Sequence, residues 1–333
     1  MSVESQARVG GAANIRRATS GDVADCAKIC YEAFGKISND HAFPPDFPSD
    51  AVAGQVLSVM FSHPGFYCIV AESGGRLIGS NCMDERGLIA GIGPITVDPA
   101  AQNHGIGRHL MRDVMDRARE RNFAGIRLVQ AAFHNRSLAL YTSLGFDPRE
   151  LLACMQGPAI QARIEGCAVR AAELRDAEEC HALCRRVHGH DRAGELTDRI
   201  DRGALVVERH GRITGYSTVA GFFGHSVAET NLDLQAIIAA AESFAGPGIL
   251  VPTRNADLFR WCPLPRTPYR TSANTHDGRS LQRAIGRLSS VDPLLTEEII
   301  RRYDTLCSVI VLLPGTDSRS RSFIPKGRHR VNA

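Results

Sequence analysis

The sequence predicts an α/β (α+β) protein with two tandem units, each a mixed, twisted sheet flanked by helices. Strands and helices are interspersed along the 333 residues, which are enough for two domains with separate cores. Segment 15–35 recurs at 169–189 with an offset of 154 residues, and Gln156-Gly157-Pro158 interrupts the pattern between the copies. The residues that coincide are Arg16/Arg170, Asp22/Asp176, Cys26/Cys180, Cys30/Cys184 and Gly35/Gly189.

The elements of the first copy follow from the spacing of its apolar residues. Gly74-Gly75 predicts a hairpin between two strands, a Pro-rich loop fills 41–50, and Asp98-Pro99 ends a strand because proline cannot continue a central ladder. We expect strands at 15–18, 66–72, 76–83, 89–97, 126–130 and near 148–155, and helices at 21–34, 50–61, 106–121 and 136–144.

The second copy repeats this pattern as far as Trp261. We expect helices at 174–188, 192–202 and 231–243, and strands at 204–208, 212–220 and 248–252. The resulting organisation is a flexible leader (1–13), a first unit (14–156), a linker (157–168), a second unit (169–262) and an atypical tail (263–333).

Composition excludes several function classes. Hydrophobic residues make up 44% and charged residues 23%, as in a globular protein, and the net charge of +3 is too small to indicate nucleic-acid binding. Apolar runs are too short for a membrane span, and the start has no signal-peptide core. The ten cysteines lie mostly in apolar or helical patterns, which favours reduced thiols and a cytoplasmic protein. A metal site at Cys180, His181, Cys184 and His188 is the alternative, although no C-x-x-C occurs there.

A glycine-rich turn, Gln102-Asn103-His104-Gly105-Ile106-Gly107, joins a predicted strand to a helix. Free N–H groups and the helix dipole favour a phosphate at such a helix start. The turn lacks the Gly-Lys-Ser/Thr of a Walker loop, and its spacing does not fit a dinucleotide fingerprint. A coenzyme A pyrophosphate loop, Q/R-x-x-G-x-G/A, remains, beside the alternative of an ordinary helix start.

Two motifs, VDPAAQNHGIGRHLM (97–111) and NRSLALYTSLGF (135–146), together resemble the GCN5-related N-acetyltransferase (GNAT) superfamily. The repeat adds a resemblance to tandem GNAT proteins. The resemblance implies that acetyl-CoA, as co-substrate, lies between splayed strands 89–97 and 126–130, beside a bulge around Gly91–Pro94. The implied cofactor-binding residues are Ile95, Thr96, Val97, Gln102, Asn103, His104, Gly105, Ile106, Gly107, Arg108 and Asn135.

The reaction that the resemblance implies is direct attack of a primary amine on the thioester, without an acyl-enzyme. Tyr141 is the expected acid, because a phenol of ordinary pKa near 10 lies about 1.5 units above a thiol. Asp84 and Glu85 stand where the family often keeps a carboxylate base, although a solvated turn would carry the same residues. No metal is expected.

The second copy lacks the phosphate loop, and Glu229 would place a negative charge where the pyrophosphate must lie. We therefore expect a degenerate GNAT-like unit that completes the acceptor cleft or packs on the first. The Ser- and Arg-rich tail reads as disordered. A second hypothesis is a frameshift near Cys262, because residues 276–295, back-translated with chosen codons and read one base later, can resemble the closing strands of tandem GNAT proteins.

These observations make an acetyl-CoA-dependent N-acetyltransferase the first hypothesis. The alternative is an acyl-CoA-binding sensor or a partner-binding protein that has kept the fold and lost turnover. The expected partner is a small-molecule amine or a protein amine, with no nucleic acid and no membrane, and a homodimer remains open.

Overall fold

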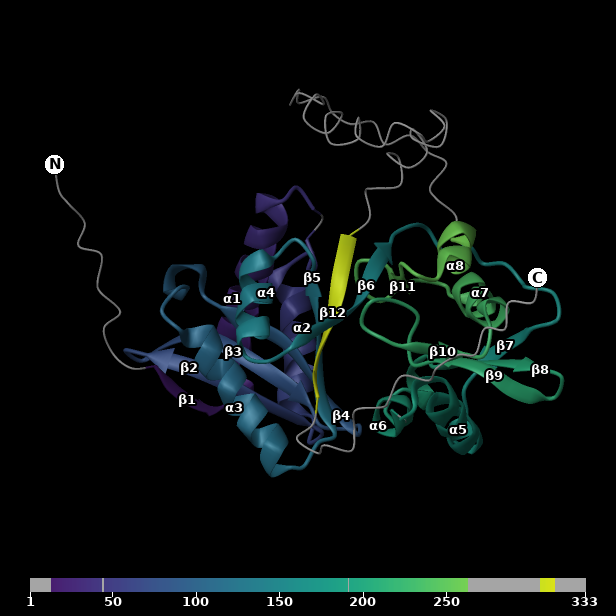
Figure 1. The fold of residues 1–333 in the computed structure, drawn as a ribbon, viewed down its shortest axis with the longest axis horizontal. Coiled ribbons are helices and arrows are strands. Elements are labelled where there is room, and N and C mark those ends of the chain that lie inside the picture. Colours follow the sequence, from purple (N-terminus) through teal and green to yellow (C-terminus); the bar gives the residue numbers. More distant parts are fainter. Residues whose placement is uncertain (1–12, 44, 191, 263–305, 315–333) are drawn as a thin grey trace, which may run out of the picture.

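An eight-stranded sheet forms the centre of the first unit and includes one strand predicted for the second unit and one from the tail (Figure 1). The computed structural model describes residues 13–43, 45–190 and 192–262 and the backbone of 306–314. The strands lie in the order β1 (Asn14–Arg17), β2 (Phe66–Ser73), β3 (Arg76–Asp84), β4 (Ile89–Val97), β5 (Gly125–Ala131), β12 (Leu306–Pro314), β6 (Asp147–Met155) and β11 (Ile249–Pro252). The predicted mixed sheet is confirmed, because β4 and β5 are parallel while the other neighbours are antiparallel.

Helices cover both faces of this sheet. Along β3, Leu77 and Cys82 both face the core under α1 (Val23–Asp40) and α2 (Asp50–Ser62), because the strand shifts register against β2 between these two residues. Ile78 and Met83 point to the opposite core, under α3 (Ile106–Glu120) and α4 (Asn135–Ser143). The gap between β4 and β5 therefore has a helical layer on either side.

The bounds predicted for the first unit are confirmed to within about two residues, with one exception at the end of α1. A short 3₁₀ turn (η1, Ser20–Asp22) precedes that helix, which continues beyond the predicted end at residue 34 to Asp40. A Lys36–Asp40 ion pair of 2.9 Å joins the additional turns. The matching glycine of the second copy, Gly189, has φ 78° and ends its helix, because only glycine adopts that conformation readily.

β4 and β5 diverge part of the way along their length. Their parallel pairing runs from Ile89 beside Gly125 to Ile92 beside Leu128. On its other side, β4 shifts register against β3. Ile92 lies opposite Met83 and Ile95 lies opposite Asn81, so β4 has one residue more than β3 between these two pairs. The additional residue lies at Gly93-Pro94, which confirms the predicted bulge and the predicted splay of the two strands.

The strand between β5 and β6 comes from the far end of the chain (yellow in Figure 1). Val309 of β12 lies opposite Gln130 on one side and Leu151 on the other. This stretch falls within the tail that the sequence indicated as disordered or frameshifted. The rest of that tail, 263–305 and 315–333, lies outside the described residues, as does nearly all of the predicted leader.

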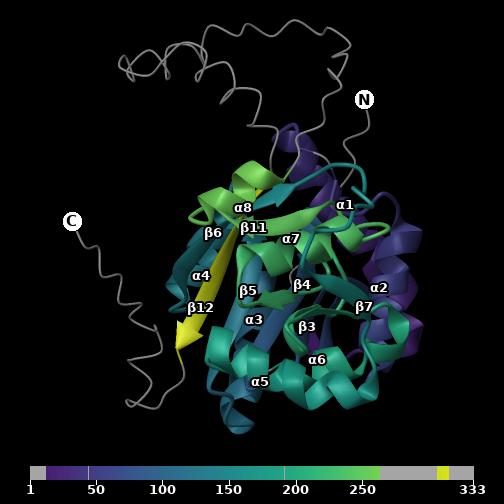
Figure 2. The same cartoon turned by 90° about the vertical axis from the view of Figure 1, so that its right-hand side faces the viewer.

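The second unit has its own four-stranded antiparallel sheet, in the order β10 (Ser226–Ala228), β9 (Arg212–Ser217), β8 (Leu205–Arg209), β7 (Ala168–Ala171). In Figure 2, α7 (Asn231–Ala240) and α8 (Ala256–Trp261) lie above α5 (Ala177–His188) and α6 (Ala193–Thr197). The predicted helix at 192–202 is broken into α6 and a 3₁₀ turn (η4, Ile200–Arg202), and β10 was not predicted. None of the helices that the structure describes is long and apolar enough to cross a membrane.

The internal repeat is visible in side-chain geometry. Arg16 binds Asp22 at 2.8 Å and Glu72 on β2 at 3.0 Å. In the second unit, Arg170 binds Asp176 and a glutamate on β8, each at 2.6 Å. The four cysteines at the repeated positions, Cys26, Cys30, Cys180 and Cys184, are completely buried. The same strand–3₁₀ turn–helix arrangement, closed by the same Arg–Asp pair, thus occurs twice.

Candidate active site

A pocket of about 400 Å³ lies where β4 and β5 diverge. One helical layer contributes Phe34, Lys36 and Ile37 of α1 to its lining, and the other contributes residues of α3 and α4. Because these helices cover opposite faces of the sheet, the pocket passes through the sheet between the two strands. It can therefore receive two ligands from opposite faces.

The β4 wall of this pocket is a free strand edge. Ile95, Thr96 and Val97 pair with β3 on one side, and within the described residues no strand pairs with their other side. The Thr96 side chain turns inward to the Ser80 hydroxyl, 3.2 Å away. The pocket therefore meets backbone N–H and C=O groups, which can bond an extended ligand as another strand would.

The loop before α3 presents positive electrostatic potential to the other end of the pocket. Gly105 precedes the helix with φ 82°, and no side chain caps the first turn, so its N–H groups are free for a ligand. Gln102 holds the loop by donating to the carbonyl of Val97 at 3.1 Å, and Arg136 contacts Gln102 from α4. Arg108 and Arg136 both line the pocket, so this end suits an anion.

The corresponding helix of the second unit is capped by its own side chains. At the start of α7, the Thr230 side chain accepts the N–H of Asp233, and the Asp233 side chain accepts the N–H of Thr230. Glu229 lies beside this turn and binds Arg212 at 2.6 and 2.7 Å. The free N–H groups that α3 offers are therefore partly satisfied within the chain at α7.

Tyr141 is buried on α4 and lines the pocket, with 5% of its surface exposed. Burial raises the pKa of its phenol to about 12, and a hydrogen bond with Ser137 opposes that rise. Ser137 in turn lies 2.8 Å from Nδ1 of His134. Burial lowers the pKa of His134 to about 4, so the imidazole is neutral near pH 7. Tyr141 is therefore a protonated phenol in a chain of hydrogen-bonding groups.

Most residues that the sequence indicated for acetyl-CoA meet in this pocket. Nine of the eleven line it, namely Ile95, Thr96, Val97, Gln102, Asn103, Gly105, Ile106, Gly107 and Arg108. His104 is not in the lining and turns Nδ1 toward the carbonyl of Ala101 at 3.4 Å. Asn135 is also outside the lining and is exposed at the start of α4, where its neighbours Arg136 and Ser137 reach the pocket instead.

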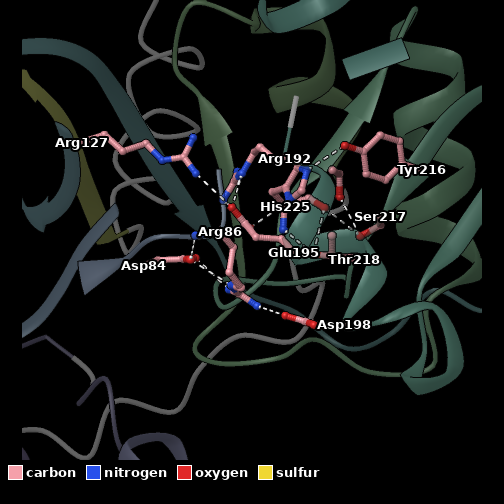
Figure 3. A network of polar contacts seen from close by, with 11 residues as sticks. Asp84, Arg86, Arg127, Arg192, Glu195, Asp198, Tyr216, Ser217, Thr218 and His225 are labelled. Carbon is pink, nitrogen blue, oxygen red and sulfur yellow. Dashed lines mark hydrogen bonds and ion pairs between the residues drawn. The ribbon is translucent and has the colours of Figure 1, made fainter. Parts of the chain in front are cut away.

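The two carboxylates expected as bases are not brought to the pocket. Glu85 accepts hydrogen bonds of 2.8 and 3.3 Å from Arg117. Asp84 accepts from Arg86 at 2.9 and 2.7 Å, and Arg86 also donates to Asp198 of the second unit at 2.6 Å (Figure 3). Their guanidinium partners lie on α3 and in the turn, so both carboxylates are occupied by structural ion pairs.

The same interface holds a second ion-pair group around Glu195 (Figure 3). Arg127 of β5 donates to this carboxylate at 3.1 Å and Arg192 at 2.6 Å, while His225 lies 3.3 Å away. Tyr216 completes the group by a 3.0 Å contact with His225. Burial lowers the pKa of Arg127 to about 10, which still leaves it charged near neutral pH. The second unit thus anchors the strand that forms one wall of the pocket.

Sequence reasoning missed several polar residues of the lining, and two of them, Gln130 and Asp46, have no polar partner among the described residues. Gln130 is only 8% exposed, and neither atom of its amide has a partner among the described residues. Because a buried amide without partners is costly, its position in the pocket indicates that a ligand bonds it. Asp46 lies in the loop between α1 and α2. Neither residue belongs to a recognisable motif, so only their burial in the pocket of the folded chain identifies them as candidate ligand-binding residues.

The alternative metal interpretation gains no support here. Within the described ranges, no group of three or more His, Cys, Asp or Glu side chains could hold a metal ion.

Comparison with known proteins agrees with this geometry. Residues 29–146 match the acetyltransferase (GNAT) family. The chain is 32% identical over 134 residues to the N-alpha-acetyltransferase RimI of Mycobacterium tuberculosis. The aligned region covers 39% of this chain and 75% of the relative.

A solved structure extends the likeness of fold beyond that region. A putative acetyltransferase from Pyrococcus horikoshii aligns with a TM-score of 0.61 at 18% identity, covering 91% of this chain and 89% of its own. The splayed strands, the uncapped helix start and these matches lead to one conclusion: the chain belongs to the GNAT acetyltransferase family.

Proposed function

We propose that this chain transfers an acetyl group from acetyl-CoA to a primary amine by direct attack in a ternary complex. The observation that carries the proposal is the pocket through the sheet, with the α3 turn at one face and α1 at the other. A cofactor and an acceptor entering from opposite faces would meet between β4 and β5. No covalent acyl-enzyme is needed when both reactants are held together.

Each part of the pocket has a role in this proposal. The N–H groups at the start of α3, with Arg108 and Arg136, bind the pyrophosphate. The free edge of β4 bonds the amides of the pantetheine arm, and Gln130 bonds a further polar group of the bound molecule. These contacts would align the thioester beside Tyr141.

Burial changes the part that Tyr141 can play. A pKa of about 12 places the phenol about 3.5 units above an ordinary thiol, rather than the 1.5 units expected from the free side chain. A free tyrosinate would therefore be strongly unfavourable. We propose that Tyr141 gives its proton to the departing sulfur as it receives one from the newly acetylated nitrogen.

The acceptor that we propose to test first is the α-amine of a peptide. The relative from Mycobacterium tuberculosis is named an N-alpha-acetyltransferase. Physical chemistry also favours this class, because near pH 7.5 about a third of a free α-amine is uncharged, against about one lysine side chain in a thousand. A small-molecule amine remains the alternative.

For the second unit we propose a degenerate copy that does not bind acetyl-CoA. The capping side chains at the start of α7 support this proposal, since they occupy donors that a pyrophosphate would need. Its contribution is mechanical, through the Glu195 contacts to Arg127 on β5.

The test follows release of the free CoA thiol from acetyl-CoA with peptides, lysine derivatives and small amines. Tyr141→Phe should lower kcat by about 10²–10⁴-fold and leave acetyl-CoA affinity unchanged. Tyr31→Phe is the control, because Tyr31 is 37% exposed on α1 and outside the pocket. Tight acetyl-CoA binding by the wild-type chain with no turnover on any amine would instead support the sensor alternative.

A further inference from the structure

One carboxylate of the pocket has no cationic partner. Asp40 and Asp46 are its two carboxylates among the described residues, and Asp40 binds Lys36 at 2.9 Å. Asp46 is half-buried and makes no hydrogen bond or ion pair with any residue that the structure describes. A sheltered carboxylate without a partner is unfavourable, so its presence in a ligand pocket points to a charge supplied by the ligand.

The described groups around Asp46 carry no positive charge that neutralises its carboxylate. The thiols of Cys30 on α1 and Cys154 on β6 lie close enough to be affected by its charge, and burial raises both pKa values to about 12, so both are neutral. Across the pocket, His134 is neutral near pH 7. Lys36 is already bound to Asp40, and the two arginines of the lining, Arg108 and Arg136, lie at the α3 end, where they donate hydrogen bonds to Ser143 and Gln102.

The position of Asp46 separates it from the cofactor end. It precedes α2 and follows α1, the helix that lines the pocket from the face opposite α3 and α4. Acetyl-CoA held at the start of α3 would therefore leave this face to the acceptor. Asp46 is the charged residue that the loop between α1 and α2 contributes to the lining.

We propose that Asp46 binds the ammonium group of the acceptor and takes its first proton. This inference rests on the proposed acetyl transfer. Burial raises the pKa of Asp46 to about 6, which makes the carboxylate a stronger base than an exposed aspartate and leaves it ionised at neutral pH.

The proton and electron balance is complete with the residues present. The ammonium gives one proton to Asp46, and the nitrogen lone pair attacks the thioester carbonyl carbon. The C–S bond breaks and its electron pair stays on sulfur, which takes the proton of Tyr141. The tyrosine recovers a proton from the acetylated nitrogen, and Asp46 releases its own to water.

Asp46→Asn tests this role, with Asp50→Asn as the matched control. Asp50 is exposed at the start of α2 and lies outside the pocket. The measured quantities are kcat/KM for a peptide α-amine between pH 5.5 and 9 and the acetyl-CoA dissociation constant. In the wild type, Asp46 lets the ammonium form react, so kcat/KM should stay level from about pH 8 to about pH 6 and fall below.

In Asp46→Asn only the uncharged amine can react. Its kcat/KM should therefore fall tenfold for each pH unit below about pH 8. The highest kcat/KM of the variant should be about 10²–10⁴-fold below that of the wild type, while the affinity for acetyl-CoA stays unchanged. An Asp46→Asn variant that keeps the wild-type rate and pH profile overturns this assignment and leaves the proposed function intact. Absence of turnover in the wild type would instead refute the proposed function.

Stability provides a second, independent readout. Because the folded pKa of Asp46 is raised, the folded state holds its proton more tightly, and wild-type stability should decline as pH rises from about 4 to about 6. Asp46→Asn should lack that decline and have a higher urea midpoint at pH 7. A lower midpoint would show that the carboxylate supports the fold, which contradicts a role reserved for the ligand.

Discussion

Gly105→Ala is the sharpest test of the anion site at the start of α3. Gly105 has φ 82°, and a Cβ added there would meet no atom within 4 Å. The substitution therefore acts through backbone strain and not through crowding. A non-glycine residue in the left-handed region costs about 1–2 kcal/mol, and the substituted loop can avoid this cost by changing conformation. Binding of acetyl-CoA must then restore the original turn.

The expected effect follows from that cost. Restoring the turn should weaken acetyl-CoA binding by about 5- to 30-fold, since 1.4 kcal/mol corresponds to tenfold. Isothermal titration calorimetry measures the affinity, and urea unfolding measures stability. Gly74→Ala is the matched control, because Gly74 has φ 59° and equally open surroundings in the turn between β2 and β3.

Gly74→Ala should lose stability and keep the wild-type affinity, whereas Gly105→Ala, whose loop relaxes in the free protein, should lose affinity and a smaller part of its stability. If calorimetry gives the Gly105→Ala protein the wild-type dissociation constant while Gly74→Ala is destabilised as expected, the α3 turn does not hold the pyrophosphate. The proposal for the cofactor end would then be wrong.

Two further predictions concern the fold. Val309→Pro should destabilise the chain by about 1–3 kcal/mol in urea unfolding and weaken acetyl-CoA binding. The reason is that each N–H of β12 faces β5 or β6, so proline leaves one acceptor of a neighbouring strand unsatisfied. Unchanged stability would show that this strand does not lie between β5 and β6. The hydrogen bonds from Arg16 lower the pKa of Asp22 in the folded protein. This ion pair therefore stabilises the fold above the unfolded pKa of aspartate, near 4, and the stabilisation is lost as the pH falls toward the folded pKa of Asp22. Asp22→Asn should reduce stability at pH 7 and flatten the acid side of the unfolding curve, and an unaltered curve would contradict the linkage.

Local signals were sufficient for the α3 and α4 side of the pocket. The run from Gln102 to Arg108 requires a strand end, a glycine in the left-handed region and a helix start, all of which depend on neighbouring residues. Tyr141 lies on a short amphipathic helix whose bounds are also local. For the same reason, the repeated Arg–Asp pair near the start of each unit could be recognised from spacing alone.

Whether the predicted carboxylates and Asp46 make polar contacts could be read only from the folded chain. Asp84 and Glu85 have the residue type of a base, but Arg86 and Arg117 occupy them in the folded chain. Asp46 has no motif around it and becomes conspicuous only because it is sheltered in the pocket and pairs with no cation among the described residues.

By itself, the sequence determined the fold class, the repeated strand–helix start of the two units and the glycine turn before α3, because hydrophobic period and glycine geometry act over a few residues. Only the tertiary structure decided that 306–314 lies between β5 and β6. Only the tertiary structure also decided which carboxylates are neutralised and which one lies unpaired in the pocket. β12 lies more than a hundred positions along the chain from both strands that it pairs with, and Cys154 beside Asp46 is also more than a hundred positions from it, so no local pattern encodes either arrangement.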